Sequence, residues 1–400
     1  MAMARLLSAL DGSRYEPRVL LLADGPLAAR LRGDGVRTAV LPAPEQLTGV
    51  GRAEVVTARG LASTAARSAA QLPRLVAAIR GSGAELVVAN SLKSAVLTAV
   101  AAPLAGRPWV WHLHDRIAPD YLPGSAVRAL RALARLPRHV VVNSRATRAT
   151  LPGLPEAHVT VAYPGLDVAG PVTPRRPARA PAFGLIGRIA PTKGQLEFLR
   201  AAARLAGDRP DVAFRVIGDA MFNDADFAAL VRALPRELGI ADRVTFTGWI
   251  DDPADELASL TALVHASPVP EPFGQVIVEA MLAGTPVIGT DAGGVPEILD
   301  PDAVGAVLAP GVTRAPLGLL VAPADPVALA SAMRWVAEHP GEAAGLAAAA
   351  RASAVERFDV RLGARSVERA WGAALRHPIS AGTPGTPGKG EDPRATPFHT

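Results

Sequence analysis

Short runs of apolar residues, four or five long, alternate along the chain with longer alanine- and leucine-rich stretches at helical spacing. Runs that are apolar at every position are typical of strands buried on both faces, as in a parallel sheet covered by helices. The pattern therefore predicts an α/β fold from one end of the chain to the other. The strands we expect are Arg18–Leu22, Thr38–Leu41, Leu86–Ala89, Trp109–His112, Val140–Asn143, Ala182–Ile186, Ala213–Ile217, Val244–Phe246, Ala262–His265, Val287–Gly289 and Gly318–Val321.

A proline-rich stretch at residues 171–181 divides this pattern into two α/β units. Four prolines in eleven residues are typical of an extended linker. We therefore predict an N-terminal domain at 1–170, a C-terminal domain at 182–360 and a final helix at 361–376. Residues 377–400 are rich in glycine, proline and threonine without a periodic apolar face, which predicts disorder.

The beginning of the chain departs from the usual order of a doubly wound domain. Met1–Leu10 has the spacing of a helix, and Arg18–Leu22 is the next expected strand. Such a domain ordinarily opens with a strand and a glycine-rich turn before its first helix. We therefore expect the first strand of the N-terminal domain to lie upstream of Met1. A chain extended upstream should then be more stable and more active than these 400 residues.

Composition narrows the classes of function. The absence of cysteine excludes disulfides and thiolate metal sites. The longest apolar run, Ala95–Ala105, is far too short to span a membrane, and the first ten residues lack a signal-peptide layout. These features predict a cytoplasmic protein. Aromatic residues make up 4% of the chain and are not interleaved with basic residues, so a nucleic-acid partner has little support.

Charge is unevenly placed, at +9 over residues 1–170 and −4 over residues 171–400. Nearly all of the positive charge is arginine, since the chain has only three lysines, Lys93, Lys193 and Lys389. The positive excess is consistent with dispersed arginines that follow the overall composition of the chain and form no binding surface. It is also consistent with a surface for anionic lipid headgroups or a phosphorylated acceptor.

The segment Glu-Pro-Phe-Gly-Gln-Val-Ile-Val-Glu, residues 271–279, carries the strongest chemical signal. Pro272 fits the first turn of a helix, and Gly274 allows backbone to approach a ligand. If every residue between them were helical, Glu271 and Glu279 would be about 12 Å apart along the helix axis. The carboxyl groups of a glycosidase are roughly 5–10 Å apart, so the spacing suits two ends of one long ligand better. The alternative is an acidic helix start followed by an exposed glutamate.

Three further turns follow expected strands of the C-terminal domain. Residues 187–194 combine Arg188 and Lys193 with glycines between a strand and a helix, an arrangement that receives phosphate at a helix N-terminus. Exposed basic residues on an ordinary loop are the alternative. Gly218 ends the next strand, and Gly293 and Gly294 form either an anion-binding turn or a compact connection. In an open α/β sheet all of these turns lie at the edge where ligands bind.

In the N-terminal domain, His112 and His114 stand two residues apart on a strand and therefore point the same way. A metal pair requires a third ligand at a sensible spacing, which the sequence lacks. A histidine that faces the cleft between the domains is favoured, with a solvated surface histidine as the alternative. Asn143 and Ser144 end the next strand, and Ser144 is expected to cap the following helix.

Taken in order, these segments resemble the retaining family-4 glycosyltransferases of the GT-B fold. The resemblance covers roughly residues 14–370 and is most specific in the second half. The segments that carry it are Trp111–Asp115, Val141–Ser144, Tyr163–Asp167, Gly187–Gly194, Val216–Asp219, Val244–Gly248, Glu271–Gly284, Gly293–Glu297 and Gly318–Asp325.

The resemblance implies two Rossmann-like, doubly wound domains facing a cleft, with the final helix returning to the first domain. The C-terminal domain would bind a nucleotide-diphosphate sugar and the N-terminal domain a glycan or lipid-linked glycan. Glu271 would bind the donor sugar and Glu279 the ribose. Residue by residue, it further implies that Arg188 and Lys193 neutralise the diphosphate. The residues implied to line the donor site are Gly218, Phe273, Gly274 and Gln275. His114, or His112 if the match shifts by two, would lie near the transferred sugar.

The implied chemistry uses the nucleotide sugar as substrate, with neither a metal nor another cofactor, and delivers the sugar on the face it left. The enzyme would work in the cytoplasm or at the inner face of the membrane. A catalytically impaired protein that binds a nucleotide sugar or a partner without transfer is the alternative, and a nucleotide-sugar 2-epimerase a more distant one. A nicotinamide dehydrogenase is disfavoured, because neither domain opens with Gly-x-Gly-x-x-Gly.

Overall fold

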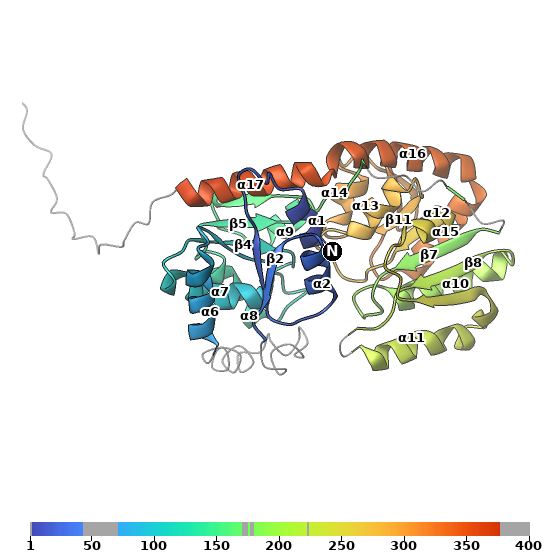
Figure 1. Ribbon diagram of the computed structural model, residues 1–400. Coiled ribbons are helices and arrows are strands. Elements are labelled where there is room, and N and C mark those ends of the chain that lie inside the picture. The colour runs from blue at the N-terminus through green and yellow to red at the C-terminus, as the bar shows by residue number, and fades with distance from the viewer. Residues whose placement is uncertain (1, 43–70, 170–174, 177–179, 222–223, 377–400) are drawn as a thin grey trace, which may run out of the picture.

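The computed structural model describes residues 2–42, 71–169, 175–176, 180–221 and 224–376. Two α/β lobes lie side by side, and the long helices α16 (Pro340–Arg357) and α17 (Val360–Arg376) run along one side of both (Figure 1). The predicted tail at 377–400 and most of the predicted linker at 171–181 lie outside the described residues.

The C-terminal lobe is built on one eight-stranded sheet in the order β12-β13-β14-β11-β10-β7-β8-β9. The strands from β7 to β11, together with β14, are parallel, and the hairpin of β12 and β13 adds two antiparallel strands at one edge. This order lets ligands approach the carboxyl ends of β7 and β10, where the winding direction reverses. The strands are β7 (Ala182–Ile186), β8 (Ala213–Ile217), β9 (Val244–Gly248), β10 (Ala262–His265), β11 (Val287–Thr290), β12 (Ala306–Ala309), β13 (Val312–Ala315) and β14 (Gly318–Val321).

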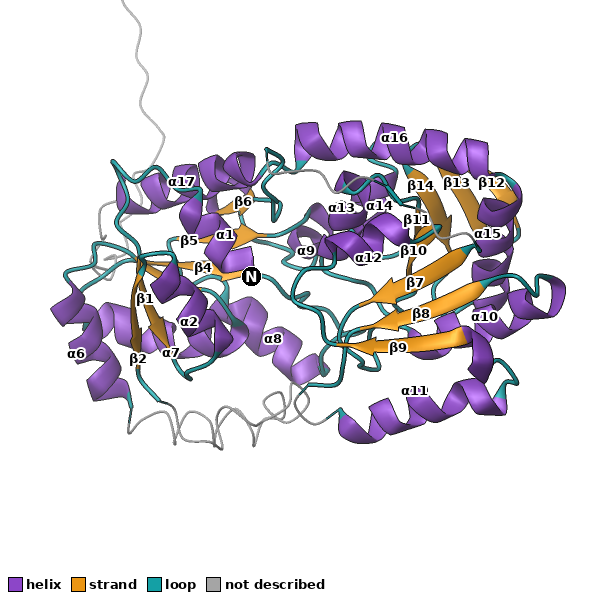
Figure 2. Ribbon diagram, turned by 45° about the vertical axis from the view of Figure 1, so that its right-hand side comes forward, coloured by secondary structure: helices purple, strands orange, loops and turns teal. Residues whose placement is uncertain are grey.

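The strands of the N-terminal lobe form two separate parallel sheets among the described residues. One contains β1 (Arg18–Leu21) and β2 (Arg37–Val40). The other has the order β3-β4-β5-β6. In Figure 2 the two-stranded sheet is turned relative to the four-stranded one. The second sheet consists of β3 (Val87–Ala89), β4 (Trp109–Leu113), β5 (His139–Val142) and β6 (Val159–Val161).

Helices cover the faces of these sheets, and α17 crosses back to pack on β5 and β6 of the N-terminal lobe. Its apolar side chains, with Trp371 at their centre, contact Val110 and Val141 of the sheet. The remaining helices are α1 (Ala2–Ser8), α2 (Pro26–Gly33), α6 (Leu72–Ser82), α7 (Leu92–Leu104), α8 (Gly124–Leu133), α9 (Arg145–Ala149), α10 (Gln195–Asp208), α11 (Ala225–Glu237), α12 (Ala254–Ser259), α13 (Gln275–Leu282), α14 (Val295–Leu299) and α15 (Pro326–Glu338).

All eleven expected strands are present, with ends displaced by no more than two residues. The α/β prediction and its parallel sheets are confirmed. Three strands were not expected. β12 is apolar at every position but was overlooked, β13 includes Thr313 and Arg314, and β6 is only three residues long.

The core of the C-terminal lobe supports the turns at the carboxyl ends of β7 and β8. Phe183, Phe198 and Phe214 are fully buried between β7, β8 and α10. At the end of β8, Gly218 has φ +126, and a Cβ placed there would lie 2.3 Å from the carbonyl oxygen of Gly187. The turn after β7 is therefore supported directly by the turn after β8.

We expect Gly218→Ala to lower the free energy of unfolding by roughly 1–3 kcal/mol, because it combines a strained φ with a backbone clash. Gly207→Ala is the matched control. Gly207 lies within α10 with nothing within 4 Å of an added Cβ, so alanine should raise stability by about 0.5–1 kcal/mol. Urea denaturation measures both changes, and equal effects would contradict the assigned role of Gly218.

Candidate functional site

An ion pair joins two loops at the carboxyl edge of the C-terminal sheet. Lys193 Nζ lies 2.9 Å from both carboxylate oxygens of Glu271. The two side chains come from the loops after β7 and β10, and they are 31% and 17% exposed. The structure therefore brings together two residues that the sequence placed 78 positions apart.

Electrostatics keep the Glu271 carboxylate charged. Burial opposes ionisation, but the positive charge of Lys193 prevails and holds the pKa of Glu271 well below its ordinary value. The ring of His265 is buried next to the pair, with Nε2 3.7 Å from Glu271 Oε2, beyond hydrogen-bonding distance. Neither ring nitrogen of His265 has a hydrogen-bond partner within the described part of the chain. The site thus presents a fixed anion, a cation and an unsatisfied imidazole.

Glycines let the loops at this edge approach one another. Gly194 has φ +78, and a Cβ there would lie 1.9 Å from the carbonyl oxygen of Ala266. Gly293 has φ +66, and a Cβ there would lie 2.1 Å from the carbonyl oxygen of Glu271, which accepts a hydrogen bond from Gly294 N at 2.8 Å. The turn at 291–297 therefore packs against the Glu271 backbone and holds it in place.

Arg188 projects from the same loop as Lys193 but pairs elsewhere. Its Nη1 lies 3.1 Å from Asp224 Oδ2, a carboxylate just before α11. The carbonyl of Arg188 accepts a hydrogen bond from Gln195 Nε2 at 2.9 Å, which fixes the backbone of the loop. Arg188 therefore lies at the same edge of the sheet, with an acidic partner that an entering phosphate would have to replace.

Helix α13 begins at Gln275, directly after Gly274, whose φ is +107. Gln275 Nε2 donates to Glu279 Oε1 at 3.3 Å, and Arg5 Nη1 of α1 lies 3.7 Å from the same oxygen. Burial raises the pKa of Glu279, and the charge of Arg5 offsets part of that shift. Glu279 thus faces the N-terminal lobe, with 24% of its side chain exposed.

Phe273 is 3% exposed and packs in an aromatic cluster instead of facing open space. Its ring stacks on Tyr163 with centroids 5.7 Å apart and meets Phe358 edge-on at 5.7 Å. The side chain therefore anchors the loop, which leaves only the backbone of Phe273 to face a ligand.

The two histidines of the N-terminal lobe stack side by side, with ring centroids 4.3 Å apart. His114 Nε2 forms a 2.9 Å hydrogen bond with Asn90 Oδ1, and Asn143 Nδ2 donates to the carbonyl of His114 at 3.1 Å. Burial lowers the pKa of both rings, and that of His112 well below its ordinary value. Both imidazoles are thereby favoured in the neutral form.

Helix α9 links the two lobes through its N-terminus. Glu297 of α14 accepts hydrogen bonds from the backbone N–H groups of Arg145 at 2.9 Å and Ala146 at 2.5 Å. Ser144 caps the same helix, as predicted, by accepting from Thr147 N, and its hydroxyl donates to the carbonyl of Pro272 at 2.6 Å. The loop that carries Glu271 is therefore attached to the N-terminal lobe.

Tyr163 completes this link. Its hydroxyl donates to Glu297 Oε2 at 2.9 Å. Burial, followed by the negative charge of Glu297, raises the pKa of Tyr163 to about 12, so the hydroxyl remains a donor at all physiological pH values. Glu297 thus satisfies two helix N–H groups and a partly buried phenol at once.

The predicted residues fall into two groups. Lys193, Glu271, Gly274, Gln275, Glu279, Arg188 and Gly218 lie along the carboxyl edge of the C-terminal sheet. In the described part of the chain, the hydrogen bonds of His114 stay within the N-terminal lobe. The described residues contain no cluster of three or more His, Asp or Glu side chains that could hold a metal, and none of their helices is long and apolar enough to cross a membrane.

Sequence reasoning missed three residues of the site, Arg5, Asp224 and His265. It also missed the interdomain role of Glu297. Glu297 and Tyr163 belong to recognised segments, but nothing local indicates that they meet across 134 residues. His265 ends an expected strand at the sheet edge where ligands bind in α/β folds, so its position in the sequence could have marked it as a site residue.

Comparison with known proteins matches both lobes to glycosyltransferases. The model described as Glycosyltransferase Family 4 matches residues 3–169, and the one described as Glycosyl transferases group 1 matches residues 180–339. Among solved structures, the Anabaena protein HepE in complex with UDP-glucose has a TM-score of 0.75 at 26% identity, covering 92% of this chain and 96% of that one. A glycosyltransferase from Rickettsia africae, with a TM-score of 0.72 at 16% identity over 94% and 95% of the two chains, shares the fold.

Curated relatives match in part. The 2-deoxystreptamine glucosyltransferase of Streptomyces kanamyceticus is 39% identical over 179 residues, which is 42% of this chain and 44% of that protein. The glycogen synthase of Mycobacterium tuberculosis is 32% identical over 243 residues, 59% of this chain and 53% of that protein. The chain spans about half the length of these relatives.

Two doubly wound lobes with a site at the carboxyl edge of the second define the GT-B class of glycosyltransferases. Within that class, the chain belongs to family 4. The predicted resemblance and fold are confirmed.

We expect Lys193→Met to lower the free energy of unfolding by about 1–3 kcal/mol at pH 7, because Glu271 would remain half-enclosed without its cation. The double variant Lys193→Met/Glu271→Gln should recover part of the loss, and urea denaturation measures the cycle. The depressed pKa of Glu271 stabilises the wild type above the ordinary value of 4.5, and this contribution is lost as pH falls through the folded pKa. The gap between wild type and Lys193→Met should therefore shrink below pH 4.5, and a constant gap would contradict the pairing.

We expect Glu297→Ala to cost about 1–3 kcal/mol and to loosen the interface between the lobes, because three donors lose their acceptor. Tyr163→Phe removes a single hydrogen bond and should cost about 0.5–1.5 kcal/mol. Glu342→Ala is the control, since this exposed partner of Arg314 contributes less than about 1 kcal/mol. Denaturation measures stability, and small-angle scattering measures the opening of the lobes. An unchanged scattering profile for Glu297→Ala would remove Glu297 from the interdomain link.

Proposed function

We propose that this member of family 4 transfers a sugar from a nucleotide-diphosphate sugar to a hydroxyl of an acceptor with retention of configuration. The observation that carries the proposal is the Lys193–Glu271 pair, placed between glycine-supported loops at the start of α13. A cation and a helix N-terminus suit the diphosphate, and the carboxylate suits sugar hydroxyls. The crystal structure of HepE with UDP-glucose makes a UDP sugar, and UDP-glucose first, the donor to test.

In the proposed reaction, the bond between sugar C1 and the diphosphate oxygen breaks while the acceptor oxygen approaches the same face. Lys193 and Arg188 would stabilise the negative charge that develops on the leaving diphosphate, with Arg188 exchanging Asp224 for phosphate. The leaving phosphate oxygen would take the acceptor proton, so atoms and charge balance without a protein base. The cations supply the charge that a metal supplies elsewhere, so we expect turnover to survive chelation.

The other site residues have positioning roles in this proposal. Glu271 would hold the donor hydroxyls from the loop that precedes α13, and Glu279 would hold the ribose from within that helix. Gly218, Gly274, Gln275 and the backbone of Phe273 would line the pocket. His114, fixed by Asn90 and favoured in its neutral form, would hydrogen-bond the transferred sugar from the N-terminal lobe.

The N-terminal lobe is the proposed acceptor side. Its sequence carries a net charge of +9 over residues 1–170, which suits an anionic or lipid-linked glycan. The proposal places the reaction in the cytoplasm, with peripheral contact to the inner face of the membrane when the acceptor is lipid-linked.

The test combines donor binding with transfer. UDP-glucose at about 100 times its dissociation constant should stabilise the chain by roughly 2.7 kcal/mol, seen as a rise in Tm. Glu279→Ala should abolish most of that rise, and Glu271→Gln should reduce transfer at least about 100-fold with a smaller effect on binding. Glu256→Gln is the control, since Glu256 pairs with Arg215 away from these loops.

Two results would overturn the proposal. A product whose anomeric configuration is inverted, read by NMR, would refute retention. Transfer by Glu271→Gln within a few-fold of wild type would refute the assigned site. Donor binding with no transfer to any acceptor would instead support the alternative of an impaired protein that only binds nucleotide sugars.

A further inference from the structure

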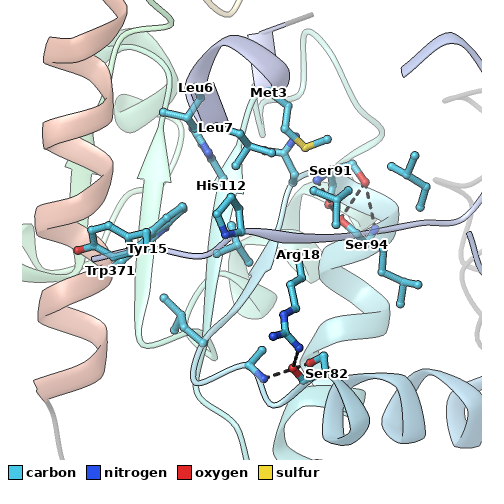
Figure 3. Close-up of a pocket in the computed structure, with 18 of the residues that line it drawn as sticks. Met3, Leu6, Leu7, Tyr15, Arg18, Ser82, Ser91, Ser94, His112 and Trp371 are labelled. Atoms are coloured by element: carbon cyan, nitrogen blue, oxygen red, sulfur yellow. Dashed lines mark hydrogen bonds between the residues drawn. The ribbon is translucent and has the colours of Figure 1, made fainter. Parts of the chain in front are cut away.

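Three histidines are buried among the described residues, and their rings have different surroundings. His139 Nε2 forms a 2.8 Å hydrogen bond with Thr160 Oγ1. His112 lies on the wall of a cavity of about 1240 Å³ in the N-terminal lobe, beside apolar side chains of α1 (Figure 3). His265 is enclosed at the end of β10, and its two ring nitrogens have no partner in the described part of the chain. Folded proteins rarely leave buried polar groups unpaired, so the imidazole of His265 is a candidate for a functional role.

The imidazole of His265 lies next to the carboxylate of Glu271. Side chains alternate between the two faces of a strand, so His265 shares a face of β10 with Leu263. Leu263 packs in one cluster with Ile277 and Val278 of α13, the helix that follows Glu271. His265 Nε2 is 3.7 Å from Glu271 Oε2, so a shift of about 1 Å would bring the two atoms within hydrogen-bonding distance.

Hydrogen bonds to backbone carbonyls anchor the segments that carry the imidazole and the neighbouring ammonium. The carbonyl of His265 accepts from Thr290 Oγ1 at 3.0 Å. The hydroxyl of Ser267, which is 1% exposed, donates at 2.6 Å to the carbonyl of Thr192, next to Lys193. The imidazole and the ammonium therefore approach the same carboxylate from anchored backbone.

Lys193 faces two anions in the proposed reaction. Its Nζ lies 2.9 Å from both carboxylate oxygens of Glu271, and its side chain is 31% exposed. An entering diphosphate would attract the same ammonium, and Glu271 would then lose the hydrogen bonds that Lys193 donates. Burial is the largest influence on the pKa of Glu271 and acts to raise it, so a carboxylate left alone there would tend to take up a proton. A protonated Glu271 would be a weaker acceptor for sugar hydroxyls.

We propose that His265 is a positioning residue for Glu271: when a diphosphate draws Lys193 away, Nε2–H of His265 donates to the Glu271 carboxylate and keeps it charged and directed at the donor sugar. This role deepens the proposed function and rests on it. In the exchange, Lys193 gives up its hydrogen bonds to Glu271 for bonds to phosphate, His265 forms one hydrogen bond, and no proton is transferred. The imidazole stays neutral with its proton on Nε2, so a single acceptor, Nδ1, remains unpaired.

The first test measures stability with no nucleotide present. Lys193→Met imitates the departure of the ammonium, and His265→Leu replaces the ring donor by an apolar side chain of similar volume. With Lys193 in place, His265→Leu should leave Tm unchanged or raise it, because the ring nitrogens have no partners to lose. In the Lys193→Met chain, where His265 becomes the donor to Glu271, the same substitution should lower Tm by at least about 3 °C. His265→Gln, which retains an N–H donor, should recover most of that loss.

His139→Leu is the matched control for stability. His139 is a buried strand histidine of the other lobe, and its partner Thr160 is present whether or not Lys193 is. Its replacement should therefore lower Tm equally in the two chains, since distant sites contribute independently. A shift for His265→Leu that is likewise equal in both chains would make His265 an ordinary core residue and overturn the proposal.

The second test measures the affinity for UDP by calorimetry. His265→Leu should raise the Kd of UDP at least about fivefold, because drawing Lys193 to the diphosphate would leave Glu271 without a partner. His265→Gln should bind UDP within about twofold of wild type, since its amide can donate in place of the ring. In the Glu271→Gln chain no charge is left behind, so adding His265→Leu should change the Kd by less than about twofold. An undiminished loss in that chain would overturn the proposal, because His265 would then act independently of the carboxylate.

The two tests separate the role of His265 from the proposed function. Transfer from UDP-glucose should fall at least about tenfold in His265→Leu and recover in His265→Gln. A wild-type chain that binds no UDP and transfers no glucose would refute the proposed function, while the Tm measurements still decide whether His265 replaces Lys193. Equal Tm shifts, together with normal transfer by His265→Leu, would refute the role of His265 and leave the proposed function in place.

Discussion

The hydrogen bonds between Glu297 and the N-terminus of α9 determine how the two lobes meet. This carboxylate belongs to the C-terminal lobe, and the N–H groups it accepts belong to the N-terminal lobe. The same short helix is capped by Ser144, whose hydroxyl holds the carbonyl of Pro272. Asn143, one residue earlier, holds the carbonyl of His114. A continuous set of hydrogen bonds thus connects His114 of one lobe to the loop that carries Glu271 in the other.

The fold was largely predictable because its strands are buried on both faces and therefore apolar at every position. β7, β8 and β10 were predicted with their exact bounds for this reason. The pattern failed where burial is one-sided or incomplete. β12 is apolar at every position, yet its Val307 is 84% exposed, and Arg314 of β13 pairs with Glu342, so composition does not report the burial of either strand. β13 pairs with β14, and nothing in the residues of β12 and β13 themselves indicates this partner.

The sequence predicted most residues of the candidate site but not which of them pair with one another. The loop glycines, Glu271 ahead of α13 and Glu279 within it can be recognised locally, because each belongs to a motif of neighbouring residues. The pairing of Lys193 with Glu271, and of Arg188 with Asp224, depends on which loops the strand order brings together. Phe273 shows the limit most clearly: its place in the motif suggested a ligand contact, while its ring is committed to Tyr163 and Phe358.

The contact of Arg5 with Glu279 has a thermodynamic consequence for the whole enzyme. Arg5 belongs to the first helix of the N-terminal lobe, and two of its guanidinium nitrogens lack partners among the described residues. Under the proposed function, a ribose that engages Glu279 would compete with this cation. Ligand occupancy and the position of α1 would then be reciprocally linked, each changing the other by the same factor. Salt, which screens the ion pair, should shift both together, so ionic strength becomes an effector of the cleft.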